Sequence, residues 1–256
     1  MELVEYDWPS KWDCAYIIPI SDTHIGDPRF NRGKLDGYID WILERPNAFT
    51  ILNGDILDVA ITESVGDTYD AKMNTNEALK YARELFDPLS DRILGVTEGN
   101  HERRVSKKTS VDVMEILADY LDVPYRPEGM YFKFRLGKGA NGKKIVYTGY
   151  FTHGTGGGRT TGGKANKIQY LSDIVLADIL SIGHIHKMLT FQDVLHVPDL
   201  YNNNIRQVKR TYVSSGAYLE WGGYAERKEY PPSKIGSPRI RLSGESSQGK
   251  DVHVSI

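Results

Sequence analysis

Short apolar runs alternate with amphipathic segments along the first two-thirds of the chain. Runs rich in β-branched residues and leucine predict buried strands at 15–20, 49–52, 92–96 and 179–182. Apolar residues three and four positions apart predict helices at 34–43, 76–85, 110–121 and 164–177. Ser110 is positioned to cap the third of these helices. Later in the chain, further strands are predicted at 130–136, 144–151, 188–197 and 205–214.

This order of elements predicts an α/β (α+β) fold. Strands and helices alternate early, whereas the later sequence is rich in strands, and this order favours two mixed β-sheets placed between helices. The sequence contains no repeat and no linker that would separate independent units. We therefore expect a single domain that spans residues 1–256.

The composition narrows the class of protein. Hydrophobic residues make up 40% of the chain and charged residues 26%, which is typical of a soluble globular protein. The net charge of −2 argues against a surface that holds long duplex nucleic acid. Cys14 is the only cysteine, so an intrachain disulfide and a cysteine metal cluster are excluded. Without a leader-like start or an apolar run of membrane-spanning length, we expect a cytoplasmic protein with no membrane partner.

Polar groups with metal-binding side chains follow most of the predicted strands. Five of the seven histidines fall in five short motifs: Asp22-Thr23-His24, Gly54-Asp55, Gly99-Asn100-His101-Glu102, His153-Gly154 and Gly183-His184-Ile185-His186. The other two histidines, His196 and His253, have no such setting, and we interpret them as ordinary surface or strand residues. Polar residues that recur where apolar strands end predict a site at the carboxyl edge of a sheet.

The residue types in these motifs are those that bind borderline divalent cations. Imidazole, carboxylate and amide oxygen together provide seven candidate ligands, namely Asp22, His24, Asp55, Asn100, His153, His184 and His186. Seven ligands suffice for two ions if Asp55 bridges them and a hydroxide lies between the ions. Two divalent ions, two aspartates and one hydroxide leave a charge of about +1, which favours an anionic phosphoester as substrate. We expect manganese first, although iron, zinc and nickel suit the same donors.

His101 is left over once the ligands are assigned. It follows Asn100, so its side chain can reach the opposite side of a substrate pocket, where a protonated imidazole would protonate the leaving oxygen. Asp58 lies three residues after Asp55 and is a candidate to orient the His101 ring. An alternative interpretation is that Asp58 simply caps a helix.

The five motifs, in this order, resemble the calcineurin-like metallophosphoesterase superfamily. The matching positions run from 22 to 186 and follow the family pattern D-x-H, G-D, G-N-H-[DE], H and G-H-x-H. The resemblance implies a four-layer αββα sandwich of two mixed β-sheets flanked by helices, with a dinuclear site at one edge. It also implies a first metal held by Asp22, His24, Asp55 and His186, and a second metal held by Asp55, Asn100, His153 and His184. By the same resemblance His101 is the catalytic histidine, and Asp58 matches a carboxylate that pairs with it in some members.

One departure from the family pattern bears on the substrate. Protein serine/threonine phosphatases carry an arginine in their second motif, whereas Val59 and Ala60 follow Asp58 here. The overall build is similar to that of small single-domain phosphoesterases of bacteria and their phages. The resemblance therefore points away from protein phosphatases and towards this smaller type.

Basic and glycine-rich segments near the motifs allow several interpretations. Residues 158–164 nearly satisfy the phosphate-binding loop of nucleotide triphosphatases, but Ala165 stands where that loop needs a hydroxyl. The stretch from Gly154 to Gly163 is either a substrate lid or a plain connection. Four basic residues are candidate substrate contacts, namely Arg103, Arg104, Arg159 and Lys164, although the run from Arg103 to Lys108 also suits a solvated helix face. Five aromatic residues crowd the C-terminal part and either pack or stack on a base: Tyr212, Tyr218, Trp221, Tyr224 and Tyr230.

The sequence predicts a metal-dependent phosphoric ester hydrolase. We expect a phosphodiesterase in which a metal-bound hydroxide attacks a nucleotide or a single-stranded nucleic-acid end. A phosphomonoesterase acting on nucleotides or proteins is the alternative within the enzyme class. A non-catalytic scaffold with the same fold and a nucleotide switch are the alternatives outside it. The oligomeric state is left open by the sequence.

Overall fold

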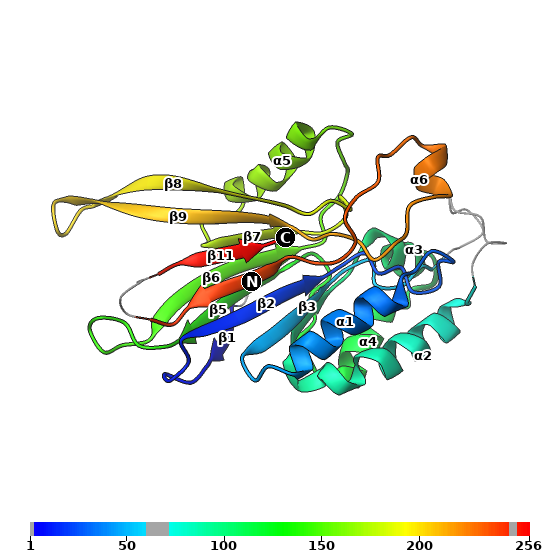
Figure 1. Cartoon of the computed structure of the whole chain (residues 1–256), viewed down its shortest axis with the longest axis horizontal. Helices are drawn as coiled ribbons and strands as arrows, with labels where there is room; N and C mark the ends of the chain where they lie inside the picture. Colours follow the sequence, from blue (N-terminus) through cyan, green and yellow to red (C-terminus); the bar gives the residue numbers. More distant parts are fainter. Residues whose placement is uncertain (1–2, 60–71, 246–249) are drawn as a thin grey trace.

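The computed structural model describes residues 3–59, 72–245 and 250–256 and contains two mixed β-sheets with helices outside both (Figure 1). Three buried clusters show how the layers pack. One lies between the two sheets, and one lies between α5 (Thr161–Gln169) and the six-stranded sheet. The third lies between the five-stranded sheet and three helices, α1 (Arg32–Leu43), α2 (Thr75–Phe86) and α4 (Val113–Leu121). This four-layer arrangement confirms the α/β fold predicted from the order of elements.

The six-stranded sheet has the order β1-β5-β6-β7-β9-β8. Its strands are β1 (Leu3–Asp7), β5 (Met130–Leu136), β6 (Ile145–Thr152), β7 (Ile179–Ile182), β8 (Leu189–Asp199) and β9 (Asn204–Ser214). β6, β7 and β9 run parallel to one another, so the carboxyl ends of these three strands meet at one edge. β5 and β6 form the antiparallel hairpin predicted around residues 138–142.

The five-stranded sheet has the order β11-β10-β2-β3-β4. Its strands are β2 (Cys14–Ile20), β3 (Ala48–Asn53), β4 (Ile93–Thr97), β10 (Arg239–Ser243) and β11 (Val252–Ser255). β2, β3 and β4 are parallel. Each is followed at its carboxyl end by one of the predicted motifs. Because the carboxyl ends of parallel strands lie at the same edge of a sheet, these three motifs lie together there.

Among the helices of the described residues, α1, α2 and α4 pack on the outer face of the five-stranded sheet and α5 packs on that of the six-stranded sheet. The described helices are α1 (Arg32–Leu43), α2 (Thr75–Phe86), α3 (Asn100–Thr109), α4 (Val113–Leu121), α5 (Thr161–Gln169) and the short α6 (Tyr224–Arg227). Two 3₁₀ turns, η1 (Asp87–Arg92) and η2 (Tyr170–Asp173), extend α2 and α5. For three of the four predicted helices, the predicted bounds lie within three residues of the observed ones. The helix predicted to reach residue 177 ends at Gln169 and continues only as η2.

Residues 100–121 form two helices where the apolar spacing predicts only the second. Ser110 does not cap α4; it ends α3 with a left-handed backbone, φ 60°. The cap of α4 is Asp112, whose side chain accepts hydrogen bonds from the Met114 and Glu115 backbone N–H groups. The basic run that follows His101 lies on α3, where Arg103 and Arg104 are half-buried and Lys107 and Lys108 are exposed.

The N-terminal segment is fixed by aromatic packing. β1 pairs in parallel with β5 and leads to Trp8, which is only 6% exposed. The Trp8 ring stacks on Phe49 and Phe134, with ring centroids 4.7 Å and 5.2 Å away. The edge strand β1 is therefore anchored to both sheets by one buried side chain.

β8 and β9 extend as a two-stranded ribbon beyond the rest of the six-stranded sheet (Figure 1). β9 pairs with β7 only from Thr211 to Ser214, so its first half pairs only with β8 among the described strands. His196 lies on this ribbon and His253 on β11, and both are exposed, as predicted.

Candidate metal centre

A first group of candidate ligands gathers where β2 and β7 end. Asp22, His24 and His186 place one donor atom each within 4.8 Å of one another. The His186 Nε2 atom lies 2.9 Å from Asp22 Oδ1, and the His24 Nε2 atom lies 4.0 Å from the same oxygen. The two imidazole nitrogens are 3.4 Å apart. Three donors that converge in this way fit one divalent ion.

A second group lies beside the first, at the ends of β3 and β6. Asp55, His153 and His184 converge within 4.8 Å, and His153 Nε2 is 3.1 Å from Asp55 Oδ2. The Asn100 side chain joins this group, because its Oδ1 atom lies 3.3 Å from His153 Nε2. The structure thus brings together all seven residues that the sequence marks as candidate ligands, in two adjacent groups.

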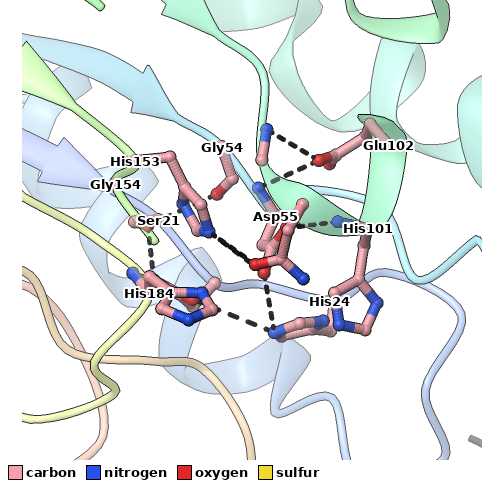
Figure 2. Close-up of polar contacts among 12 residues, drawn as sticks. Ser21, His24, Gly54, Asp55, His101, Glu102, His153, Gly154 and His184 are labelled. Atoms are coloured by element: carbon pink, nitrogen blue, oxygen red, sulfur yellow. Dashed lines mark hydrogen bonds and ion pairs between the residues drawn. The ribbon is translucent and has the colours of Figure 1, made fainter. Parts of the chain in front are cut away.

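Asp55 lies between the two groups. Its Oδ2 atom is 3.1 Å from His153 Nε2 in the second group and 4.0 Å from His24 Nε2 in the first (Figure 2). The other carboxylate oxygen, Oδ1, accepts a hydrogen bond from the His101 backbone N–H at 2.8 Å. One oxygen is therefore fixed by the backbone, and the other faces both groups, as a bridging ligand would.

The candidate ligands lie on turns with an unusual backbone conformation. Within the described segments, nine non-glycine residues have φ in the left-handed region. Five of the nine are candidate ligands with φ between 48° and 64°, namely Asp22, His24, Asp55, His184 and His186. Aspartate and histidine tolerate this region better than most residues, but each instance still costs about 1 kcal/mol or more. Such clustering is typical of functional sites, where the surrounding structure holds a strained turn in place.

Two glycines of the motifs allow the turns to approach one another. A Cβ atom on Gly99 would lie 2.1 Å from Asp55 N, and one on Gly54 would lie 2.7 Å from His153 Cβ. Gly54 also has φ +78°, whereas the Gly99 backbone is extended, with φ −96°. Gly99 is therefore required by space alone, because the second and third motifs touch there.

Burial and neighbouring charges set the protonation of the site. Burial lowers the pKa of His24 to about 3, so this imidazole is neutral at physiological pH, as a metal ligand must be. Burial also lowers the pKa of His184, and the charge of His153 adds to this effect. For His153, burial opposes protonation, but the charges of Asp55 and Asp22 raise its pKa to about 10. The two carboxylates therefore favour a positive charge between them.

One buried oxygen supports metal binding directly. Asp22 is fully buried, and among the described residues its Oδ1 atom has no hydrogen-bond donor. The His186 Nε2 atom lies 2.9 Å from this oxygen, close enough for both atoms to bind one cation. A buried carboxylate oxygen without a donor lowers the stability of the fold, and a cation bound by Asp22 Oδ1 and His186 Nε2 would remove this cost. The donor set thus fits a divalent ion.

His101 and Asp58 form a pair next to the first group. His101 Nδ1 is 2.9 Å from Asp58 Oδ1, and the His101 ring packs edge-on against His24 with ring centroids 4.5 Å apart. Burial alone would lower the pKa of His101, but the hydrogen bond to Asp58 and the charge of Asp55 raise it above its usual value. The ring is therefore kept protonated more readily than a free imidazole, and Asp58 fixes its orientation.

Three residues that sequence reasoning did not assign hold the ligands in place. Glu102 is completely buried and accepts a hydrogen bond from the Asp55 backbone N–H at 3.1 Å (Figure 2). It also accepts hydrogen bonds from the Leu57 and Gly99 backbone N–H groups, at 2.8 and 3.0 Å. Ser21 donates to Asp22 Oδ2, and the Asn53 carbonyl lies 2.9 Å from His153 Nδ1. Each of the three is next to, or inside, a quoted motif, but only the folded chain shows which group it contacts.

Comparisons with known proteins add little to this geometry. The chain matches no protein-family profile and no curated protein. Among solved structures, it is similar to Vps29 of Chaetomium thermophilum at 11% identity, over 94% of each chain, with a TM-score of 0.40. A likeness this weak supports no conclusion, so the interpretation of the site rests on its own residues. Within the described residues, no helix is both long and apolar enough to cross a bilayer.

The four basic residues proposed as substrate contacts differ in their surroundings. Arg103 is ion-paired with Glu98 at 2.9 Å, and the Arg159 side chain is exposed, 4.0 Å from Glu229. Lys164 Nζ donates a hydrogen bond to the Ile185 carbonyl at 2.7 Å. The positive charge of Arg104 lowers the pKa of both His101 and Asp58.

The aromatic residues of the C-terminal part divide into buried and exposed members. Tyr212 and Tyr218 are fully buried, so packing explains both. Trp221 and Tyr230 are 49% and 38% exposed, and the Trp221 indole N–H donates to the Tyr230 carbonyl. The Tyr230 ring also lies 5.9 Å from the Arg159 guanidinium, and the side chain of Tyr224 lies outside the described part of the chain.

Proposed function

We propose that this chain is a metal-dependent phosphoesterase that acts as a phosphodiesterase on nucleotides or nucleic-acid ends. The observation behind the proposal is the position of one carboxylate oxygen. Asp55 Oδ2 lies 3.1 Å from His153 Nε2 in its own group and 4.0 Å from His24 Nε2 in the other group, and the His101–Asp58 pair packs against His24. This combination suits phosphoryl transfer, in which charge must be stabilised at phosphorus while the leaving oxygen receives a proton.

Two divalent ions are proposed as the cofactors, with Asp55 shared between them. Asp22, His24 and His186 would hold the first ion, and Asn100, His153 and His184 would hold the second. When bound, such ions supply positive charge that stabilises the phosphoryl oxygens and activates a water molecule at neutral pH. We favour manganese for this donor set, which also suits iron, zinc and nickel.

The chain's own contribution is to fix the ligands and to move one proton. Asp58 accepts a hydrogen bond from His101 Nδ1–H, which leaves the Nε2–H of a protonated ring free to donate to the leaving oxygen. The raised pKa of His101 keeps that proton in place near neutral pH. Arg104, whose charge acts on this pair, is proposed to contact the substrate phosphate.

The choice of a diester over a monoester rests on the segment after Asp58. Val59 is 1% exposed and occupies the position where protein phosphatases carry an arginine. A dianionic monoester has one more negative charge to neutralise than a diester, so the lack of a cation at this position favours the diester. Phosphomonoesterase activity is the alternative.

A paired assay tests the proposal. The protein, stripped of metal and then supplied with Mn²⁺, is tested with bis-p-nitrophenyl phosphate and with p-nitrophenyl phosphate. We expect diester hydrolysis that requires metal, that is lost in Asp55→Asn, and that is retained in His253→Gln, a control at an exposed histidine. Faster hydrolysis of the monoester would favour the alternative. Absence of hydrolysis of both esters by metal-loaded protein would contradict the proposed activity and favour a non-catalytic scaffold.

A panel of natural phosphoesters then addresses the substrate. Single-stranded DNA, RNA, cyclic nucleotides and nucleoside monophosphates are tested under the same Mn²⁺ conditions. Preference for a nucleotide or a nucleic-acid end would support the proposed substrate class. Activity on none of them, with activity on the small diester, would refute it.

A further inference from the structure

Lys164 contacts the loop that carries two candidate ligands. It lies on the first turn of α5, and its Nζ donates a hydrogen bond of 2.7 Å to the backbone carbonyl of Ile185. The sequence predicts that Lys164 contacts phosphate, because Lys164 follows a glycine-rich stretch directly. In the structure, the ammonium group instead binds a carbonyl located between His184 and His186.

Ile185 is the central residue of this loop. The candidate ligands on either side of it, His184 and His186, both have left-handed φ values, 64° and 48°. The Ile185 N–H donates to the Gly183 carbonyl at 2.7 Å, and its side chain is 3% exposed, in the same buried cluster as Ile168 of α5. The α5 helix therefore holds Ile185 through both its side chain and its carbonyl.

A second contact joins the same two elements in the opposite direction. Lys187 follows His186 directly, and its Nζ donates to the Thr161 hydroxyl at 2.8 Å. Thr161 is the first residue of α5. A lysine from each element therefore bonds to the other, so the position of the loop relative to α5 is fixed at both sides of His186.

We propose that Lys164 is a positioning residue for His184 and His186, which sets their alignment for metal binding. This inference rests on the proposed metal centre, although it does not depend on the reaction. The hydrogen bond to Ile185 stabilises a carbonyl between two strained turns and so holds one ligand of each group in register. Hydrogen bonds of this kind, one step removed from a metal, are commonly worth about 10–100-fold in metal affinity.

The charge of Lys164 allows three possible roles of this residue to be distinguished by Mn²⁺ affinity. If the ammonium group acted on the ions only through its charge, its removal would strengthen Mn²⁺ binding, because like charges repel. If it only contacted substrate phosphate, its removal would raise KM and leave Mn²⁺ affinity unchanged. A positioning role predicts weaker Mn²⁺ binding, in the opposite direction to the electrostatic effect.

The experiment measures Mn²⁺ affinity of the metal-stripped full chain by calorimetry. Lys164→Met keeps the length of the side chain without the donor, Lys164→Arg keeps a donor and the charge, and Lys167→Met removes a charge from the same helix as a control. We expect Lys164→Met to bind Mn²⁺ about 10–100-fold more weakly, Lys164→Arg to bind more tightly than Lys164→Met, and Lys167→Met to match the unmodified protein. Unchanged or tighter binding by Lys164→Met would overturn the proposal.

Two further measurements keep the outcome clear. Circular dichroism and Tm in EDTA show whether Lys164→Met folds; if it does not, Lys164→Gln, which is polar but has a shorter side chain, removes the same contact with Ile185 and is expected to weaken Mn²⁺ binding as well. Unaltered Mn²⁺ affinity in that variant would then overturn the proposal. Failure of the unmodified protein to bind Mn²⁺ would refute the metal centre itself. Normal Mn²⁺ binding without ester hydrolysis would refute the proposed reaction and leave the role of Lys164 intact.

Discussion

The contact between Gly99 and Asp55 makes a strong prediction about a single methyl group. In Gly99→Ala, the added Cβ would lie 2.1 Å from Asp55 N and 2.2 Å from Asp55 Oδ1. Nonbonded heavy atoms settle at about 3.5–4.0 Å, so the overlap exceeds about 1 Å. The backbone of Gly99 is extended and would accept alanine without strain, so the whole effect comes from this contact.

Neither side of the contact can move freely. Asp55 is held by Glu102 through its N–H and by the His101 N–H through Oδ1. Gly99 is itself bound to Glu102 through its N–H at 3.0 Å. We therefore expect the methyl group to cost about 1–3 kcal/mol of folding stability, as overpacking of a rigid core does. A chain of this size then loses about 2–4 °C in Tm per kcal/mol.

Metal binding is expected to weaken together with folding stability. Displacement of Asp55 disturbs both groups of ligands at once, so Mn²⁺ affinity should fall by at least about 10–100-fold. The measurements are Tm in EDTA and Mn²⁺ titration by calorimetry. Gly37→Ala in α1 is the control, because no atom lies within 4 Å of its Cβ; it should gain about 0.5–1 kcal/mol and bind Mn²⁺ normally. Normal Tm and Mn²⁺ affinity in Gly99→Ala would refute the close approach of the two motifs.

Three further predictions concern the proton donor and the fold. His101→Asn should slow hydrolysis of esters with poor leaving groups about 10²–10⁴-fold, with a smaller effect on p-nitrophenyl esters and none on Mn²⁺ affinity. Asp58→Asn removes the contact that raises the pKa of His101, so the loss of activity at alkaline pH should begin at lower pH; an unshifted pH–rate profile would contradict the pairing. Trp8→Ala should destabilise the protein by about 3–5 kcal/mol in chemical denaturation, because Trp8 fills the space between Phe49 and Phe134.

The candidate ligands could be predicted because each follows an apolar strand. β2, β3 and β4 are buried and nearly continuous in apolar sequence, so both their positions and the motifs after them stand out. The order of the motifs then supplied the resemblance to a family and the grouping of ligands. The two groups in the structure match that grouping, with Asp55 between them.

Other strands and helices are hard to predict from their own residues. β10 and β11 are strands of only five and four residues; β10 pairs with distant β2, and β11 pairs with β10. β1 is a polar edge strand whose partner, β5, lies more than 120 residues away. The α3 helix has few apolar residues, so no hydrophobic spacing reveals it; its first turn is fixed instead by Glu102.

Contacts around the ligands were not predictable for a similar reason. Glu102 accepts hydrogen bonds from the backbone N–H groups of Asp55 and Leu57, and Lys164 donates to the backbone carbonyl of Ile185. Every residue has these backbone groups, so the sequence does not indicate which of them will be bound. A sequence pattern identifies side chains that suit a reaction, but it does not show which backbone groups hold them. Those contacts come only from the way in which β3, β4 and β7 meet at one edge.

The central claim, that Asp55 is shared by two metal sites, is tested most directly by counting bound ions. The measurement is the number of tightly bound Mn²⁺ ions per chain in the unmodified protein, Asp22→Asn, His184→Asn and Asp55→Asn. The account predicts two ions in the unmodified protein, loss of one in each of the first two variants, and loss of both in Asp55→Asn. Two tightly bound ions in Asp55→Asn, or none in the unmodified protein, would contradict it.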